Sequence, residues 1–141
     1  MESTSKETVR KMRKEDVTKA FFETMREVRK SNPQATQNDI IEQAAKCKAP
    51  RFYVTFENAR RYISLMVRKK RVPIVNKNKM EMYKEIYRRY IKRIQESSCP
   101  YRFIVLENII EEPAPSFYLD EETFRGIVYK TLREGKPSVA W

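Results

Sequence analysis

The sequence contains no histidine, and this absence limits the chemistry that the chain can perform. Histidine is the side chain whose ordinary pKa lies closest to neutral pH, and its imidazole is the commonest metal ligand in proteins. Acid–base catalysis by histidine and zinc sites that contain imidazole are therefore excluded. The two cysteines, Cys47 and Cys99, stand alone and form no C-x-x-C pair. Two isolated thiols are too few for a zinc site or a disulfide framework, so we expect reduced thiols and no metal or other cofactor.

Glycine and long apolar runs are also scarce. Gly126 and Gly135 are the only glycines, which excludes the glycine-rich phosphate loops of P-loop and Rossmann nucleotide enzymes. The longest apolar runs, at 62–67 and 103–106, fall far short of the roughly 20 residues that a membrane-spanning helix needs. The first residues contain no apolar segment of the kind found in secretory signals. We expect a cytoplasmic protein without a membrane partner, nucleoid-associated if bacterial or viral, with the nucleus as the eukaryotic alternative.

Positive charge is abundant and unevenly placed. The 141 residues include 30 Lys and Arg against 19 Asp and Glu, a net charge of +11. Residues 1–76 hold 18 basic and 9 acidic side chains, a net charge of +9. Residues 77–141 hold 12 and 10, a net charge of +2. Such segregation favours a polyanionic partner over charge that serves only solubility.

The sequence is similar to itself at an offset of 65 residues. The pattern A-P-x-F-Y occurs at 49–53 and again at 114–118, and later apolar positions, such as Ile63 and Val128, keep the same offset. Earlier apolar positions align as well when one extra loop residue is allowed. Because such self-similarity indicates a repeated structural unit, we predict an all-α fold, formed by tandem duplication of a three-helix module with the two copies packed together.

This repeat defines a predicted division of the chain. It comprises a basic N-terminal extension (1–14), a strongly basic first copy (15–72), a connector (73–79), a second copy (80–135) and a C-terminal tail (136–141). A module of this size has a lone hydrophobic core that contributes only about 3–5 kcal/mol. We therefore expect the two copies to pack on each other.

Local signals place the helices within each copy. Apolar residues at helical spacing predict first helices over 14–30 and 79–97. Thr36 is a predicted N-cap for the second helix of the first copy, and Thr55 and Asp120 are predicted N-caps for the two third helices. The matching second helix, at 101–110, is rich in β-branched and aromatic residues, which leaves a short strand as the alternative.

An aromatic pair precedes each predicted third helix, Phe52–Tyr53 in the first copy and Phe117–Tyr118 in the second. Both copies keep the pair, although only the first is strongly basic. This favours a structural role, in which the rings fix the loop on the core of the module. Stacking on a nucleobase is the functional alternative.

Two clusters of basic residues are candidates for contact with a phosphate backbone. The first lies on the third helix of the first copy and its exit, and the second lies on the first helix of the second copy: Arg60, Arg61, Arg68, Lys69, Lys70 and Arg71, then Arg88, Arg89, Lys92 and Arg93. A solvated helix surface is the plain alternative. For Arg60 and its counterpart Arg125, internal pairing with Glu42 and Glu107 is a second alternative.

These features favour a non-catalytic nucleic-acid-binding protein, with double-stranded DNA preferred over RNA as the ligand. A tight helix-turn-helix does not fit, because 45–55 is too long for its turn. The alternative is a protein-interaction or assembly module, such as a small viral or mobile-element structural component, with an acidic protein partner or a homo-oligomer. Its interface would be the stripe formed by Tyr83, Tyr87, Tyr90 and Ile94. An enzyme is disfavoured, since helix capping accounts for the acidic residues near 120.

Overall fold

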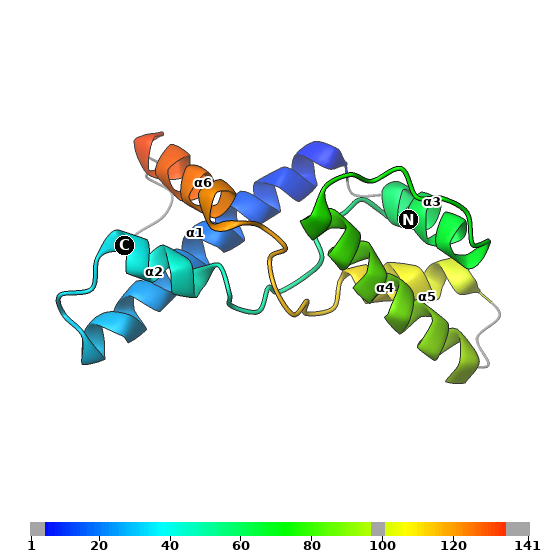
Figure 1. The fold of residues 1–141 in the computed structure, drawn as a ribbon, viewed down its shortest axis with the longest axis horizontal. Coiled ribbons are helices and arrows are strands. Elements are labelled where there is room, and N and C mark those ends of the chain that lie inside the picture. The colour runs from blue at the N-terminus through cyan, green and yellow to red at the C-terminus, as the bar shows by residue number, and fades with distance from the viewer. Residues whose placement is uncertain (1–4, 97–100, 135–141) are drawn as a thin grey trace.

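The computed structural model describes residues 5–96 and 101–134, and these form six helices (Figure 1). In chain order the helices are α1 (Lys6–Ser31), α2 (Gln37–Ala44), α3 (Phe56–Val67), α4 (Lys77–Glu96), α5 (Arg102–Ile110) and α6 (Glu121–Arg133). The all-helical prediction is confirmed, and 101–110 is helical rather than extended. The predicted helix end at Ser97, the thiol of Cys99 and the C-terminal tail lie outside the described residues. Within the described part, no helix is both long and apolar enough to cross a bilayer.

The predicted N-caps hold the starts of three helices. The Thr36 hydroxyl accepts a hydrogen bond from the Asp39 amide at 3.2 Å, and the Asp39 carboxylate accepts one from the Thr36 amide, which completes a capping box. Thr55 accepts from the Asn58 amide at 3.2 Å. Asp120 accepts from the Thr123 amide at 2.7 Å, which lowers the pKa of the Asp120 carboxyl. The free amide groups at these helix starts are thereby satisfied.

Helix α1 begins at Lys6, earlier than the predicted start at residue 14. Ser5 is its N-cap, and the Ser5 hydroxyl accepts a hydrogen bond from the Thr8 amide at 3.2 Å. Val9 is buried, so the apolar face of α1 extends through residues that composition alone marked as a basic extension. The residues of that extension from Lys6 onward belong to the first helix.

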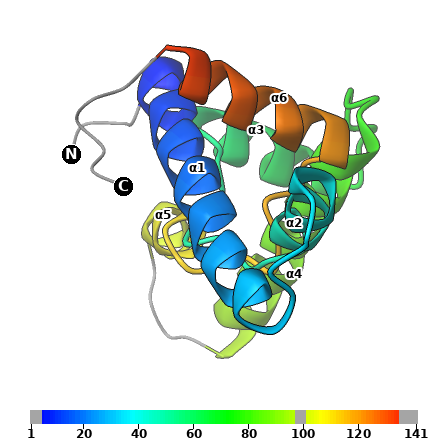
Figure 2. The same cartoon turned by 90° about the vertical axis from the view of Figure 1, so that its left-hand side faces the viewer.

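The helices form two three-helix bundles, one at each end of the molecule (Figure 1). Figure 2 looks onto the end that α1, α2 and α6 form. One bundle consists of α1, α2 and α6, and the other consists of α3, α4 and α5. Sequence order predicts that α3 packs with α1 and α2, but α3 lies against α4 and α5 instead. Likewise, α6 follows α4 and α5 in sequence but packs on α1 and α2. Each bundle therefore takes one helix from the other half of the chain.

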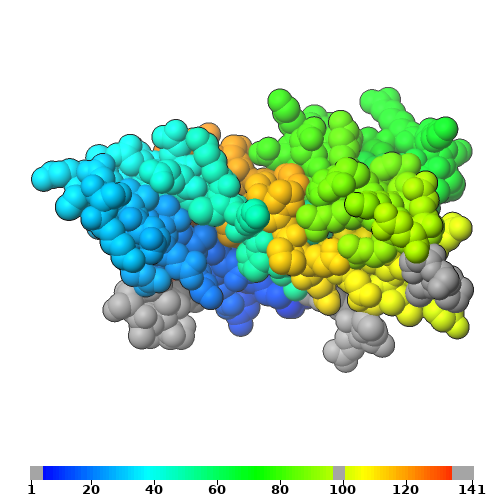
Figure 3. Space-filling view, turned by 90° about the horizontal axis from the view of Figure 1, so that it is seen from below, coloured from blue at the N-terminus to red at the C-terminus, as the bar shows by residue number. Residues whose placement is uncertain are grey.

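The two segments that carry α3 and α6 to opposite ends cross at the centre of the molecule. Ala49 and Ala114 form an antiparallel bridge with N···O distances of 3.0 and 2.9 Å. Phe52 stacks on Tyr118 with ring centroids 6.3 Å apart, and Tyr53 stacks on Phe117 at 5.9 Å. The structural role predicted for these rings fits this packing, but each ring lies against the opposite segment. In Figure 3 the two segments, in teal and orange, meet between the ends.

Buried residues form one continuous core through both bundles and the crossing. The largest side chains that are fully buried come from five of the helices and from the first crossing segment: Phe21, Phe52, Phe124, Ile40, Ile41, Ile86, Ile109, Val17 and Val128. Tyr53 ties this segment to α1 through a hydrogen bond from its hydroxyl to Asp16 at 2.6 Å. Burial, first, and that hydrogen bond both raise the pKa of Tyr53.

The crossing should carry much of the stability of the fold. Phe52 is 1% exposed, so we expect Phe52→Ala to lower the free energy of unfolding by about 3–5 kcal/mol, because it removes buried surface and leaves a cavity. Phe103 is 53% exposed, so Phe103→Ala is a matched control that should change it by about 0.5 kcal/mol or less. Urea denaturation measures both values. Equal effects of the two substitutions would contradict the central role of the crossing.

Candidate nucleic-acid interface

The first predicted cluster is exposed and retains its charge. Arg60 and Arg61 lie on α3, Arg68 caps its C-terminus, and 69–71 lead toward α4. All six side chains are exposed, and none forms an ion pair with an acidic side chain in the described part of the chain. The Arg68 Nε donates a hydrogen bond to the Ser64 carbonyl at 3.3 Å. The guanidinium of Arg61 lies 5.4 Å from the ring centroid of its neighbour Tyr62.

A lysine in the left-handed conformation shapes the exit from α3. Lys69 has a φ of 57°, its amide donates to the Met66 carbonyl at 3.0 Å, and the Lys70 amide donates to the Leu65 carbonyl at 2.8 Å. This pattern is a Schellman motif, which usually places glycine at the left-handed position. Three consecutive basic residues, Lys69, Lys70 and Arg71, follow the C-terminus of α3 at this turn.

The second predicted cluster, on α4, is largely neutralised. Arg88 makes two hydrogen bonds to the Glu85 carboxylate at 2.9 and 2.6 Å, and Arg89 makes a third at 2.8 Å. Arg93 binds the Glu112 carboxylate at 2.5 and 3.1 Å. Of this cluster, only Lys92 is without an ion pair among the described residues. Arg89 and Arg93 connect α4 to the chain that leaves α5, whereas Arg88 pairs with Glu85 within α4.

Arg89 also reaches the crossing. Its guanidinium donates to the Pro113 carbonyl at 3.0 Å and lies 5.0 Å from the ring centroid of Phe52. The interaction of a cation with an aromatic ring adds to the packing of the buried phenyl group. Arg89 is thus a structural residue in this fold, although sequence reasoning placed it on a binding surface.

The fold brings both predicted clusters into the same bundle. Residues 56–112, which form α3, α4 and α5, hold 14 basic and 7 acidic side chains, a net charge of +7. The rest of the chain holds 16 and 12, a net charge of +4. The difference in net charge is smaller in the fold than between residues 1–76 and 77–141 of the sequence, but the segment with α3, α4 and α5 still holds the larger part of the net positive charge.

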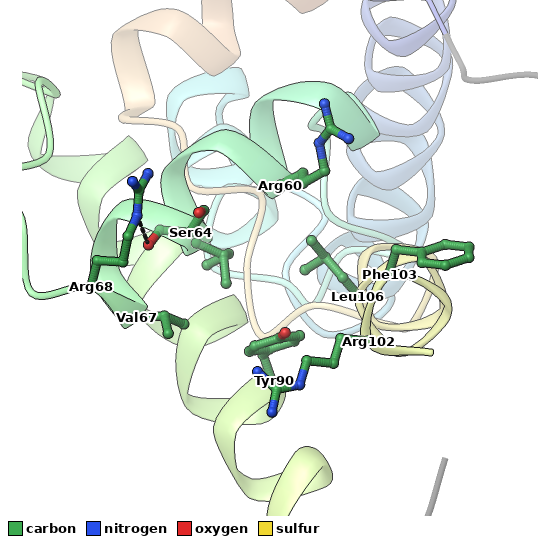
Figure 4. A pocket seen from close by; sticks show the side chains of 9 residues that line it. Arg60, Ser64, Val67, Arg68, Tyr90, Arg102, Phe103 and Leu106 are labelled. Atoms are coloured by element: carbon green, nitrogen blue, oxygen red, sulfur yellow. Dashed lines mark hydrogen bonds between the residues drawn. The ribbon is translucent and has the colours of Figure 1, made fainter. Parts of the chain in front are cut away.

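A pocket of about 290 Å³ lies between α3, α4 and α5, beside the first cluster (Figure 4). Arginines at its edge come from α3 and from the start of α5, and its other lining residues are mostly apolar or aromatic: Arg60, Arg68 and Arg102, with Ile63, Ser64, Val67, Tyr90, Phe103 and Leu106. No acidic side chain lines it. The arginines of α4 line a separate pocket that shares none of these residues.

Sequence reasoning missed Arg102 and Phe103. Phe103 is 53% exposed and follows the exposed Tyr101 and precedes the exposed Ile104 in sequence, and contiguous exposed apolar side chains can mark binding surfaces. In sequence, the apolar run 103–106 reads as part of a core segment. Nothing in the local sequence pattern places Arg102 beside Arg60 and Arg68, because these residues come together only through the packing of α3 on α5.

Two alternative roles considered from the sequence find no support in the observed contacts. Within the described residues, neither Arg60 nor Arg125 forms an ion pair with an acidic side chain, and Glu42 pairs with Lys46 at 3.7 Å. The tyrosine stripe on α4 is not a free surface: Tyr83 is 4% exposed, and the other three side chains of the stripe pack against the core. The described residues also contain no group of three acidic or cysteine side chains able to hold a metal ion.

Comparison of the chain with protein-family models, with curated proteins and with solved structures finds no match.

The ion-pair network on α4 should make stability depend on pH in a defined range. Hydrogen bonds from Arg88, first, and from Arg89 lower the pKa of the Glu85 carboxyl below its ordinary value. The contribution of ionised Glu85 to the free energy of unfolding is therefore complete above the ordinary glutamate pKa of about 4.3. It is lost as the pH falls through the lower pKa that Glu85 has in the folded state.

We expect Glu85→Gln to reduce the free energy of unfolding by up to about 1 kcal/mol near pH 7, since the pair is partly exposed to solvent. The difference from the wild type should shrink below about pH 4. Urea denaturation from acid to neutral pH measures it. A difference that grows as the pH falls would show that Glu85 is not stabilised as the anion.

The positive φ of Lys69 gives a second prediction, which concerns stability. Lys69→Gly relieves the conformational cost of a side chain at positive φ, so the protein should become more stable by about 1 kcal/mol. The same change removes one cation from the exit of α3. Thermal or urea unfolding tests the stabilisation, and a destabilised variant would show that the lysine stem contributes packing here.

Proposed function

We propose that the protein binds nucleic acid, with double-stranded DNA as the favoured ligand, through the cations of α3 and its exit. The observation that carries the proposal is the exposed cluster formed by Arg60, Arg61, Arg68, Lys69, Lys70 and Arg71, whose charges no described acid neutralises. We define these six residues, together with Arg102, as the basic surface.

Binding through the basic surface rests on phosphate contacts. The guanidinium of an arginine can donate two parallel hydrogen bonds to one phosphate, whereas a lysine acts as a point charge. Each neutralised phosphate releases condensed counterions, so several contacts supply most of the binding free energy at moderate salt. Such contacts carry no direct sequence information, and the proposed function is binding without catalysis.

The arginines of α4 have a smaller role in this proposal than in the sequence-based prediction. Arg88, Arg89 and Arg93 are held by carboxylates, so moving one of them to a phosphate would first break its hydrogen bonds to Glu85 or Glu112. Lys92 is the member of that cluster that remains available. The proposed contact surface is therefore centred on α3 and its exit.

The proposal includes the tandem duplication. It is supported by positions that correspond at the offset of 65 and are buried in both halves: Ile40 and Val105, Ile41 and Leu106, Ala44 and Ile109, Ala49 and Ala114, Phe52 and Phe117, Ala59 and Phe124, and Ile63 and Val128. Val17 and Tyr83, which correspond when one extra loop residue is allowed, are also both buried. Thr55 and Asp120, which also correspond, cap the third helices. In this interpretation, the two copies have exchanged their third helices.

The test of binding removes three charges from the exit of α3. We expect the triple substitution Lys69→Gln, Lys70→Gln and Arg71→Gln to weaken binding to a random DNA duplex by more than about tenfold at low salt, and to reduce the slope of log K against log salt by about one per lost phosphate contact. Fluorescence anisotropy at several salt concentrations measures both quantities.

A matched control removes the same charge from the opposite bundle. Lys11, Arg26 and Arg29 are exposed cations of α1, and replacing all three with Gln should change affinity by less than about threefold. Equal losses in both triple variants would mean that net charge alone drives binding. A wild-type slope near zero would remove the proposed function, and an oligomer that is indifferent to DNA in light scattering would favour the assembly alternative.

A further inference from the structure

The pocket beside the basic surface differs from the corresponding place in the other bundle. At the repeat offset, Ser64 of α3 corresponds to Tyr129 of α6, and Arg102 corresponds to Gln37. The Tyr129 hydroxyl donates a hydrogen bond to the Gln37 side-chain oxygen at 3.2 Å. In the α1–α2–α6 bundle, these two side chains therefore bridge the space between the third and second helices. In the α3–α4–α5 bundle, the small Ser64 side chain leaves that space open.

The residues that replace the bridge change the chemistry of the site. Arg102 brings a positive charge where the other bundle has an amide, and Phe103 brings an exposed ring where the other bundle has Asn38. Figure 4 shows Arg102 extending from the start of α5 toward Tyr90, while Leu106 faces the pocket. The site thus combines an apolar and aromatic interior with an edge of three arginines.

We propose that this pocket accepts one unpaired nucleotide of a nucleic acid whose duplex lies on the basic surface. The base would enter between Val67, Tyr90 and Leu106, and its phosphate would meet the arginines at the edge. The inference rests on the proposed function, because Arg60 and Arg68 belong both to the pocket and to the basic surface. It goes beyond that function by naming an unpaired end or junction as the preferred ligand.

Charge and size support this ligand. All three charged residues that line the pocket are arginines, which excludes a cationic ligand and suits a phosphate. A volume of about 290 Å³ lies at the lower end of the range for small-molecule pockets, which suits one flat ring system. A paired base cannot enter, because both of its faces are stacked within the duplex, whereas an unpaired base can stack on aromatic side chains.

The experiment closes the pocket without changing its charge. Ser64→Tyr introduces the residue that the other bundle carries at the corresponding position, and Ser64→Ala keeps the pocket open as the matched control. Each purified protein is titrated into a blunt DNA duplex and into the same duplex with a short single-stranded thymidine tail. Fluorescence anisotropy gives the affinities, and urea denaturation checks that both variants are folded.

We expect the wild type and Ser64→Ala to bind the tailed duplex about tenfold more tightly than the blunt duplex, the scale of one base stacked on an aromatic ring. Ser64→Tyr should lose this preference and keep its affinity for the blunt duplex. Blunt-duplex binding with no preference in the wild type would overturn the pocket inference alone. The pocket inference would also be overturned if Ser64→Tyr kept the preference for the tailed duplex, or if it lost affinity equally for both ligands. Failure of the wild type to bind either DNA would overturn the proposed function as well.

Discussion

The structure depends on the pairing of two short segments at its centre. Ala49 and Ala114 exchange backbone hydrogen bonds, and the small side chains at these positions let the two backbones approach closely. Just beyond the bridge, each aromatic pair stacks on the other. Because the segments run in opposite directions, they carry α3 and α6 to opposite ends of the molecule. The composition of both bundles follows from this single crossing.

Local structure could be predicted from the sequence because it depends on near neighbours. Thr36, Thr55 and Asp120 act on amide groups three residues away, and the helices that they start follow from apolar spacing. The packing of α3 on α4 and α5, and of α6 on α1 and α2, could not be predicted in this way. Phe52 has the same reason to be buried whether its partner ring lies in its own half or in the other, so hydrophobic patterning fits both arrangements equally well.

The candidate site was predictable to the extent that charge is visible in the sequence. The six cations between Arg60 and Arg71 are exposed as expected, and none of them forms an ion pair among the described residues. The cluster on α4 has the same appearance in sequence, yet Arg93 is bound by Glu112, 19 residues away. Whether a cation is free is decided by packing, and packing also brought Arg102 to the pocket. Counting charges in the sequence neither distinguishes free cations from paired ones nor identifies Arg102 as part of the pocket.

The packing of α6 on α1 and α2 also fixes the order in which the two bundles can fold during translation. Helices α3, α4 and α5 are contiguous in sequence, so their bundle can close as soon as they leave the ribosome. Helices α1 and α2 precede that bundle in the chain but lack their third partner until α6 has been synthesised. Their apolar faces stay uncovered throughout that interval, which makes α1 and α2 of the newborn chain the natural target for chaperones.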